Sequence, residues 1–229
     1  MKTLKKIKTN YQITIDGPAG SGKSTIAKLL AQKLSYIYID SGAMYRATTL
    51  YFIKNNLLNK SEKAINAHLK KIKIRFKKNR NNYSVILNNK DVSKEIRTAL
   101  VNQNVSEVSS KKTIRTELVK RQREIAANCP VVMDGRDIGT TVFPDANLKI
   151  YLTASVYIRV NRRRKDLLEL SETVSIKELI KQIQQRDNLD SSRKISPLSK
   201  AQDAIVIDTS GLTINNVLEE INLFLPNRL

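Results

Sequence analysis

The sequence is poor in the residues that form cross-links and metal clusters. Its 229 residues include one cysteine, Cys129, which excludes an internal disulfide, and we interpret this residue as part of the core. The one histidine, His68, cannot form a metal cluster alone. No run approaches the ~18 apolar residues of a membrane span, and no apolar stretch of a secretory signal follows the basic first residues. We therefore expect a cytoplasmic protein with no membrane partner.

Negative charge is also scarce. The chain carries 21 Asp and Glu against 41 Lys and Arg, which gives a formal net charge of +20. Such a surplus attracts nucleic acid or other polyanions, but the basic residues are scattered along the whole length. Aromatic residues make up only 5%, without an RNA-binding aromatic signature. The charge is therefore weak evidence for a nucleic-acid partner and stronger evidence for an anionic substrate.

Glycine is rare as well, and its positions are informative. The chain has seven glycines, and six of them lie in three short stretches, at residues 17–22, 40–42 and 134–139. Glycine allows sharp turns and a close approach of the backbone to a ligand. These three stretches are therefore the candidate functional site.

The first stretch is a phosphate-binding loop. It has the pattern glycine, four residues, glycine-lysine-serine, and it follows an apolar segment at 11–15 and precedes helical apolar spacing at 24–34. Its backbone N–H groups can point inward at an anion, Lys23 brings a cation to the β- and γ-phosphates, and Ser24 offers a hydroxyl to Mg²⁺. The residues predicted to bind ATP are Gly17, Pro18, Ala19, Gly20, Ser21, Gly22, Lys23, Ser24 and Thr25.

The order of the predicted elements is typical of an α/β protein with a parallel sheet. Strands are predicted at 11–15, 36–39, 131–133, 147–152 and 204–207. Asp134 follows the third of these strands in the form of a Walker B element, which holds Mg²⁺ directly or through water, although this short pattern also recurs by chance. Two further strands, at 72–76 and 83–87, predict an antiparallel hairpin outside the main sheet.

A basic cluster lies on a helix predicted at 156–170. The cluster consists of Arg159, Arg162, Arg163, Arg164 and Lys165. It is compatible with a nucleic-acid patch, a solvated face, or a mobile lid whose arginines reach transferring phosphates. Beside a phosphate-binding loop we favour the lid, because arginine can neutralise the charge on phosphoryl oxygens while the closed lid excludes water.

Three further motifs extend the pattern of the loop. They are Asp-Ser-Gly-Ala-Met-Tyr-Arg at 40–46, Asp-Val-Ser-Lys-Glu-Ile-Arg-Thr at 91–98 and Asp-Gly-Arg-Asp-Ile-Gly-Thr at 134–140. With these motifs in this order, the chain closely resembles the bacterial cytidylate kinase family from about residue 12 to residue 221.

The resemblance implies the fold of a P-loop nucleoside-monophosphate (NMP) kinase, with a five-stranded parallel sheet flanked by helices. It also implies three parts. The core comprises residues 1–40, 111–154 and 201–229; the NMP-binding domain with an antiparallel insert comprises 41–110; the lid comprises 155–200.

The implied reaction is transfer of the ATP γ-phosphoryl group to CMP or dCMP, giving CDP or dCDP and ADP in pyrimidine nucleotide metabolism. ATP and Mg²⁺ are the implied cofactors, with Ser24 and Asp134 as metal residues. We expect a monomer with no dedicated nucleic-acid partner. The implied catalytic residues are Lys23, Arg136, Arg159, Arg162 and Arg163.

Most of the residues implied to bind CMP fall into three groups by role. The resemblance implies Ser41, Arg46, Arg136 and Arg193 at the acceptor phosphate, Arg186 and Asp190 at the sugar, and Ser106, Arg115 and Asp137 at the cytosine. Tyr45 is also implied to bind CMP, with no part of the substrate assigned to it. The role of Asp137 also has independent chemical support. A carboxylate accepts a hydrogen bond from the cytosine amino group, whereas uracil presents an acceptor there.

Two alternatives remain at this point. One is a kinase on the same fold that acts on UMP or another small molecule. The other, from a different class, is an ATPase stimulated by nucleic acid, which the charge of +20 motivates.

Overall fold

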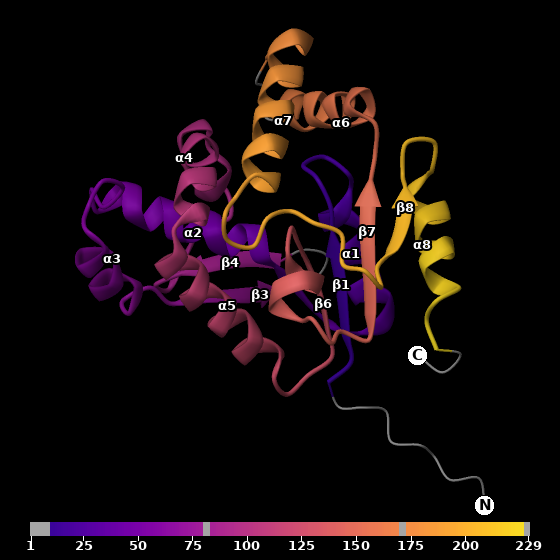
Figure 1. Cartoon of the computed structure of the whole chain (residues 1–229), viewed down its shortest axis with the longest axis horizontal. Helices are drawn as coiled ribbons and strands as arrows, with labels where there is room; N and C mark the ends of the chain where they lie inside the picture. Colours follow the sequence, from indigo (N-terminus) through magenta and orange to yellow (C-terminus); the bar gives the residue numbers. More distant parts are fainter. Residues whose placement is uncertain (1–9, 80–82, 170–172, 227–229) are drawn as a thin grey trace, which may run out of the picture. The chain divides into compact units, whose positions relative to one another are not determined.

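The computed structural model describes residues 10–79, 83–169 and 173–226 of the chain. These residues form two compact units, Met1–Ile39 with Ile125–Leu229, and Asp40–Glu124. Each unit has its own sheet (Figure 1).

The first unit is built on a five-stranded parallel sheet with the order β2-β6-β1-β7-β8. The strands are β1 (Gln12–Asp16), β2 (Ile37–Asp40), β6 (Val131–Gly135), β7 (Leu148–Thr153) and β8 (Ile205–Asp208). The central strand β1 pairs with β6 and β7, and its register sets Ile15 opposite Asp134 and Asp16 opposite Gly135. The carboxyl ends of three neighbouring strands therefore meet at one edge, where parallel sheets bind ligands.

Apolar side chains on both sides of the sheet form the core of this unit. Ile13, Ile15, Val132 and Met133 on β1 and β6 are fully buried. Helix α1 (Lys23–Leu34) packs on these two strands and on α8 (Ile214–Asn222) through apolar residues one turn apart. The sheet thus holds the first residues of α1 at the carboxyl end of β1.

Two helices, α6 (Val156–Leu168) and α7 (Ile176–Ser191), follow β7 and pack against each other (Figure 1). Their contact is a small apolar core of its own, made by Val160, Leu167, Leu179 and Ile183.

A short π-helix, η2 (Ile138–Val142), follows β6. Single-turn π-helices occur often at functional sites.

The second unit contains α2 (Ser41–Lys54), α3 (Glu62–Leu69), the 3₁₀ helix η1 (Glu95–Arg97) and α4 (Ala99–Ser110). Its sheet has the order β3-β4-β5, and the antiparallel strands are β3 (Ile74–Lys78), β4 (Tyr83–Leu87) and β5 (Lys90–Asp91). Helix α5 (Lys112–Ala126) returns the chain to the first unit. The predicted hairpin is therefore present, and β5 extends it; part of its predicted turn, residues 80–82, lies outside the described residues.

The predicted α/β class and five-stranded parallel sheet are confirmed. The division into core, NMP-binding domain and lid remains a prediction. Residues 155–200, predicted as the lid, belong to the same compact unit as the sheet, and the second unit continues past residue 110 to Glu124.

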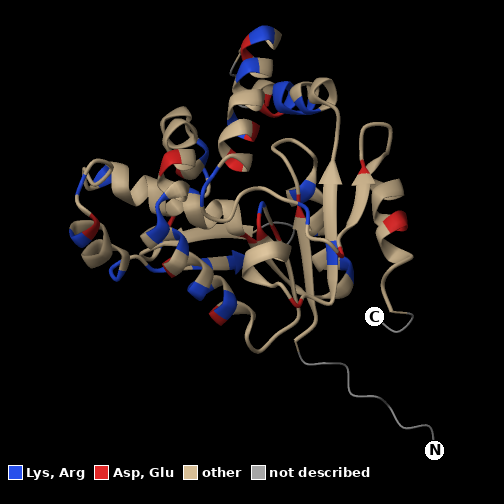
Figure 2. Ribbon diagram, viewed as in Figure 1, with Lys and Arg blue, Asp and Glu red and all other residues tan. Residues whose placement is uncertain are grey.

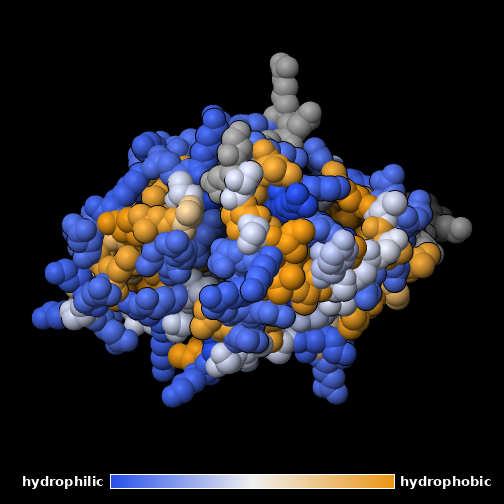
Figure 3. Space-filling model, turned by 90° about the horizontal axis from the view of Figure 1, so that it is seen from above, coloured by the Kyte–Doolittle hydropathy of each residue, from blue (hydrophilic) through white to orange (hydrophobic). Residues whose placement is uncertain are grey.

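Basic residues are spread over the surface of the molecule. Figure 2 shows Lys and Arg on helices of both units, and Figure 3 shows hydrophilic side chains over much of one face with apolar areas between them. Within the described parts of the chain, no helix is long and apolar enough to span a bilayer.

Candidate active site

The phosphate-binding loop runs from the end of β1 to the start of α1. Its three glycines have positive φ angles, 146° at Gly17, 77° at Gly20 and 89° at Gly22. A Cβ atom on Gly17 would lie 2.0 Å from the carbonyl oxygen of Leu152 on β7, so no other residue fits there. The loop is thus formed by close contact with the neighbouring strand.

Lys23 holds its ammonium group inside this loop. Its Nζ donates to the carbonyl oxygen of Pro18 at 2.6 Å and to the Ser21 Oγ at 3.4 Å, and the side chain is almost completely buried. Burial, with the nearby Arg136 guanidinium, lowers the pKa of Lys23 well below its ordinary value, against the opposing pull of Asp134 and Asp16. A bound anion would offset this cost of burial, which suits a phosphate-binding lysine.

Ser24, at the start of α1, contacts Asp134 on β6. The Ser24 Oγ donates to the Asp134 Oδ2 at 2.6 Å. A hydroxyl and a carboxylate are hard oxygen donors of the kind that Mg²⁺ takes, with phosphates and water completing its coordination. No group of three or more His, Cys, Asp or Glu that could hold a metal occurs among the described residues.

Asp16, the last residue of β1, binds the turn that carries Asp137. Its two carboxylate oxygens accept from the backbone N–H groups of Ile138 at 2.9 Å and Gly139 at 2.7 Å. Burial raises the pKa of Asp16 to about 6; the Asp137 carboxylate adds to the rise, whereas the two N–H groups and Lys23 oppose it. Asp137 itself is 4% exposed. Asp16 therefore fixes the start of η2 next to the phosphate-binding loop.

Three arginines surround Asp190 near the end of α7. The Asp190 carboxylate lies 2.8 Å from the Arg136 Nε, 4.0 Å from the Arg186 Nε and 3.9 Å from the Arg193 Nη1. Burial opposes ionisation of Asp190, but the three guanidinium groups outweigh it and lower its pKa. Three positive charges against one negative charge leave this cluster suited to an anion. The structure thus brings four of the predicted CMP-binding residues together.

Two of the predicted lid arginines, Arg159 and Arg162, contact the phosphate-binding loop. Arg159 is buried, donates to the carbonyl oxygens of Ala19 and Ala154 at 3.0 Å and pairs with Asp187, which also accepts from the Ala19 N–H. Arg162 donates to Thr209 at 2.8 and 2.9 Å and to the Gly20 carbonyl at 3.4 Å.

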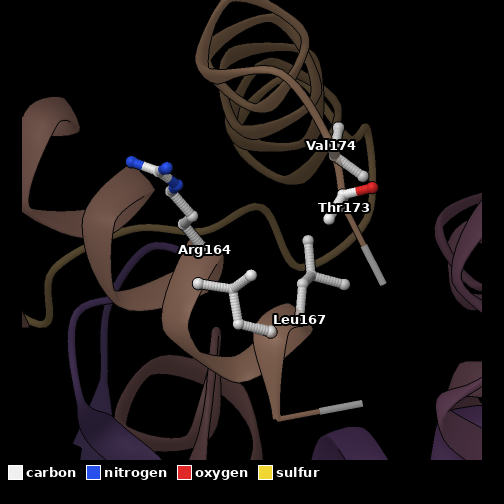
Figure 4. Close-up of a pocket in the computed structure, with 5 residues that line it drawn as sticks. Arg164, Leu167, Thr173 and Val174 are labelled. Atoms are coloured by element: carbon white, nitrogen blue, oxygen red, sulfur yellow. The ribbon is translucent and has the colours of Figure 1, made fainter. Parts of the chain in front are cut away.

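Arg163 is half-buried on α6. A pocket of about 90 Å³ lies between α6 and the residues just before α7 (Figure 4); it is lined by Arg164, Leu167, Leu168, Thr173 and Val174. Nucleotide-sized pockets start at about 300 Å³, so this one does not take ATP.

The second unit holds five more of the predicted CMP-binding residues: Ser41, Tyr45, Arg46, Ser106 and Arg115. Helix α2 begins at the buried Ser41 after its N-cap, Asp40, accepts from the Ala43 N–H at 2.7 Å. One turn on, an Arg46 Nη1 lies 3.0 Å from the position that a Cβ on Gly42 would occupy, so glycine makes room for this guanidinium.

The Arg115 guanidinium lies 5.3 Å from the centre of the Tyr45 ring and donates to the Ser109 carbonyl at 3.1 Å. Arg115 is 2% exposed, and Ser106, on α4, is half-buried. A cation–π contact therefore joins the side chains of Arg115 and Tyr45 in this unit.

Sequence reasoning did not assign four residues that contact the site. Asp16 holds the η2 turn, Asp187 pairs with Arg159, Thr209 binds Arg162, and the Tyr38 hydroxyl donates to the Asp134 Oδ1 at 3.0 Å. Asp16 and Thr209 lie at or next to the carboxyl ends of parallel strands, which is a signal that could have found them.

A parallel sheet with such a loop after its first strand defines a P-loop nucleotide-binding protein. The protein-family model for cytidylate kinase matches residues 13–225. The cytidylate kinase of Leuconostoc mesenteroides is 49% identical over 221 residues, covering 96% of this chain and 99% of that protein. The cytidylate kinase of Lactobacillus johnsonii is 50% identical over 220 residues, covering 95% and 96%. The chain therefore belongs to the cytidylate kinase family, a family of phosphotransferase enzymes.

A solved structure of an uncharacterized protein from Eubacterium ventriosum is similar in fold. It aligns with a TM-score of 0.50 and 13% identity, and the alignment covers 95% of this chain and 99% of that one. This likeness concerns the fold alone.

The raised pKa of Asp16 predicts a pH-dependent stability. Because its folded-state pKa of about 6 lies above the ordinary 3.8, protonated Asp16 favours folding; this stabilisation is complete below about pH 3.8 and is lost as pH rises through 6. The side chain of Asp16→Asn does not titrate. Relative to this variant, the free energy of unfolding of the wild type should fall by about 2 kcal/mol between pH 4.5 and pH 7.5. Urea unfolding of both proteins at the two pH values measures this, and a pH-independent difference would contradict it.

Proposed function

We propose that this enzyme transfers the γ-phosphoryl group of ATP to CMP or dCMP, giving CDP or dCDP and ADP, in pyrimidine nucleotide metabolism. The single observation that carries the proposal is the family match over residues 13–225, which includes the loop that holds Lys23 and the arginines around Asp190. We also propose that it acts in the cytoplasm as a monomer, without a nucleic-acid partner.

The donor site in this proposal is the loop from Gly17 to Thr25. Its N–H groups and Lys23 bind the phosphates of ATP, and the positive end of α1 adds to the attraction. Ser24 and Asp134 would hold Mg²⁺, which when bound neutralises charge on the phosphates. Ser24 as a residue is exposed, whereas Lys23 and Asp134 are buried.

The acceptor phosphate is assigned to Ser41, Arg46, Arg136 and Arg193. Arg136 and Arg193 lie beside Asp190, while Ser41 and Arg46 lie in the first turns of α2 with Tyr45. Arg186 and Asp190 are assigned to the sugar. The surplus of positive charge around Asp190 supports an anionic ligand there.

Cytosine recognition is assigned to Ser106, Arg115 and Asp137. The buried carboxylate of Asp137 suits the cytosine amino group, and a uracil carbonyl facing it would leave two acceptors opposed. The loss of a hydrogen-bond partner for a buried group gives strong discrimination.

Catalysis in this proposal depends on positioning and charge neutralisation, so no strong general base is required. Residues 155–200 act as a lid, and Arg136 and the lid residues Arg159, Arg162 and Arg163 neutralise the transferring phosphoryl group. The contacts of Arg159 and Arg162 with loop carbonyls support their place next to the donor phosphates.

The activity is tested by ADP release from ATP·Mg²⁺ with CMP, dCMP, UMP, AMP, RNA or no acceptor, and by chromatography of the products. We expect turnover with CMP and dCMP and the formation of CDP and dCDP. Activity with RNA as the only productive acceptor would overturn the proposed acceptor, and so would the absence of activity with every monophosphate.

The role of Asp137 predicts a change in base selectivity. Asp137→Ala removes a charged hydrogen bond worth about 1.5–3 kcal/mol, so kcat/KM for CMP should fall about 10- to 150-fold, with a much smaller change for UMP. Asp145→Ala, which removes an exposed carboxylate further along the same segment, is the matched control. An unchanged CMP to UMP ratio in Asp137→Ala would remove its role in base recognition.

A further inference from the structure

The carboxylate of Asp134 is held on both of its oxygens. The Ser24 Oγ donates to Oδ2 at 2.6 Å, and the Tyr38 hydroxyl donates to Oδ1 at 3.0 Å. Ser24 comes from α1 and Tyr38 from β2, which neighbours β6 in the sheet. Two separate elements therefore set the orientation of one carboxylate at the carboxyl end of β6.

The contact with Tyr38 is buried. Tyr38 is 5% exposed and Asp134 is 4% exposed, so water does not readily replace this hydrogen bond. An aspartate carboxylate otherwise turns easily, because its last torsion is broad. Hydrogen-bond donors on both oxygens restrict that rotation, so the orientation of the Asp134 carboxylate is set before a ligand binds.

We infer that Tyr38 is a positioning residue that orients Asp134 for the Mg²⁺ of the ATP complex. The inference rests on the proposed role of Ser24 and Asp134 as metal residues. Tyr38 acts through the carboxylate, as residues that hydrogen-bond to metal ligands commonly do, and such residues change metal affinity or activity about 10- to 100-fold when they are replaced.

The chain offers a matched control two residues away. Tyr36 is also buried, at 8% exposed, and its hydroxyl has no hydrogen-bond partner among the described residues. Tyr36→Phe and Tyr38→Phe each remove one buried hydroxyl from the same segment. Only Tyr38→Phe removes a hydrogen bond to Asp134.

The test compares affinity for ATP with and without the metal. Isothermal titration calorimetry gives the Kd for ATP in excess Mg²⁺ and in EDTA. The ratio of the Kd in EDTA to the Kd in Mg²⁺ is the factor by which the ion strengthens ATP binding. We expect Tyr38→Phe to reduce this ratio about tenfold, to leave the Kd in EDTA unchanged, and to shift Mg²⁺ activation of CMP phosphorylation to higher concentrations. Tyr36→Phe should behave as the wild type in all three.

A purely structural role for Tyr38 would weaken ATP binding equally with and without Mg²⁺, and that result would overturn the inference. Asp134→Ala separates the inference from the proposal beneath it. If Asp134→Ala removes the effect of Mg²⁺ while Tyr38→Phe retains it fully, only the inference fails. If Asp134→Ala leaves the effect of Mg²⁺ intact, the proposed metal site fails, and the role of Tyr38 fails with it. Thermal melting of each variant verifies that it is folded.

Discussion

The hydrogen bond between Ser24 and Asp134 joins the two segments of the proposed donor site, the phosphate-binding loop and the end of β6. It exists because β1 and β6 are parallel neighbours in a register that sets Ile15 opposite Asp134. β1 ends one residue later, at Asp16, and the loop that follows brings Ser24, in the first turn of α1, to the Asp134 carboxylate. The loop, the proposed metal residues and Arg136, proposed to bind the acceptor phosphate, all depend on this strand pairing.

The loop is held from several directions besides this contact. Asp16 ties its beginning to the η2 turn, and Arg159 and Arg162 donate to the carbonyls of Ala19 and Gly20. Carbonyl groups in such a loop point away from an anion that the N–H groups bind. Arginine contacts on that side therefore support the loop without occupying the phosphate site, and they connect α6 to the loop that it is proposed to cover.

The sequence predicted the parts of the site that are contiguous in the chain. Residues 17–25 and Asp134 were found because their spacing itself encodes a backbone shape and a strand end. The contact of Tyr38 with Asp134 was not predictable in the same way, since it depends on β2 lying next to β6, which strand order alone decides. Likewise, the run of arginines predicts that α6 is a basic helix. It does not predict which arginine contacts the loop, and in the structure it is Arg159, and not Arg163, that donates to the Ala19 carbonyl. The π-helix after Asp137 also has no sequence signal of its own.

The most direct test of the account is the turnover of Lys23→Ala with ATP·Mg²⁺ and CMP, beside Lys33→Ala, which removes an exposed lysine from the last turn of the same helix. The account predicts a folded Lys23→Ala protein whose kcat is at least about 100-fold lower, and a Lys33→Ala protein close to the wild type. Near wild-type turnover in a folded Lys23→Ala protein would contradict the assignment of phosphoryl transfer to this loop.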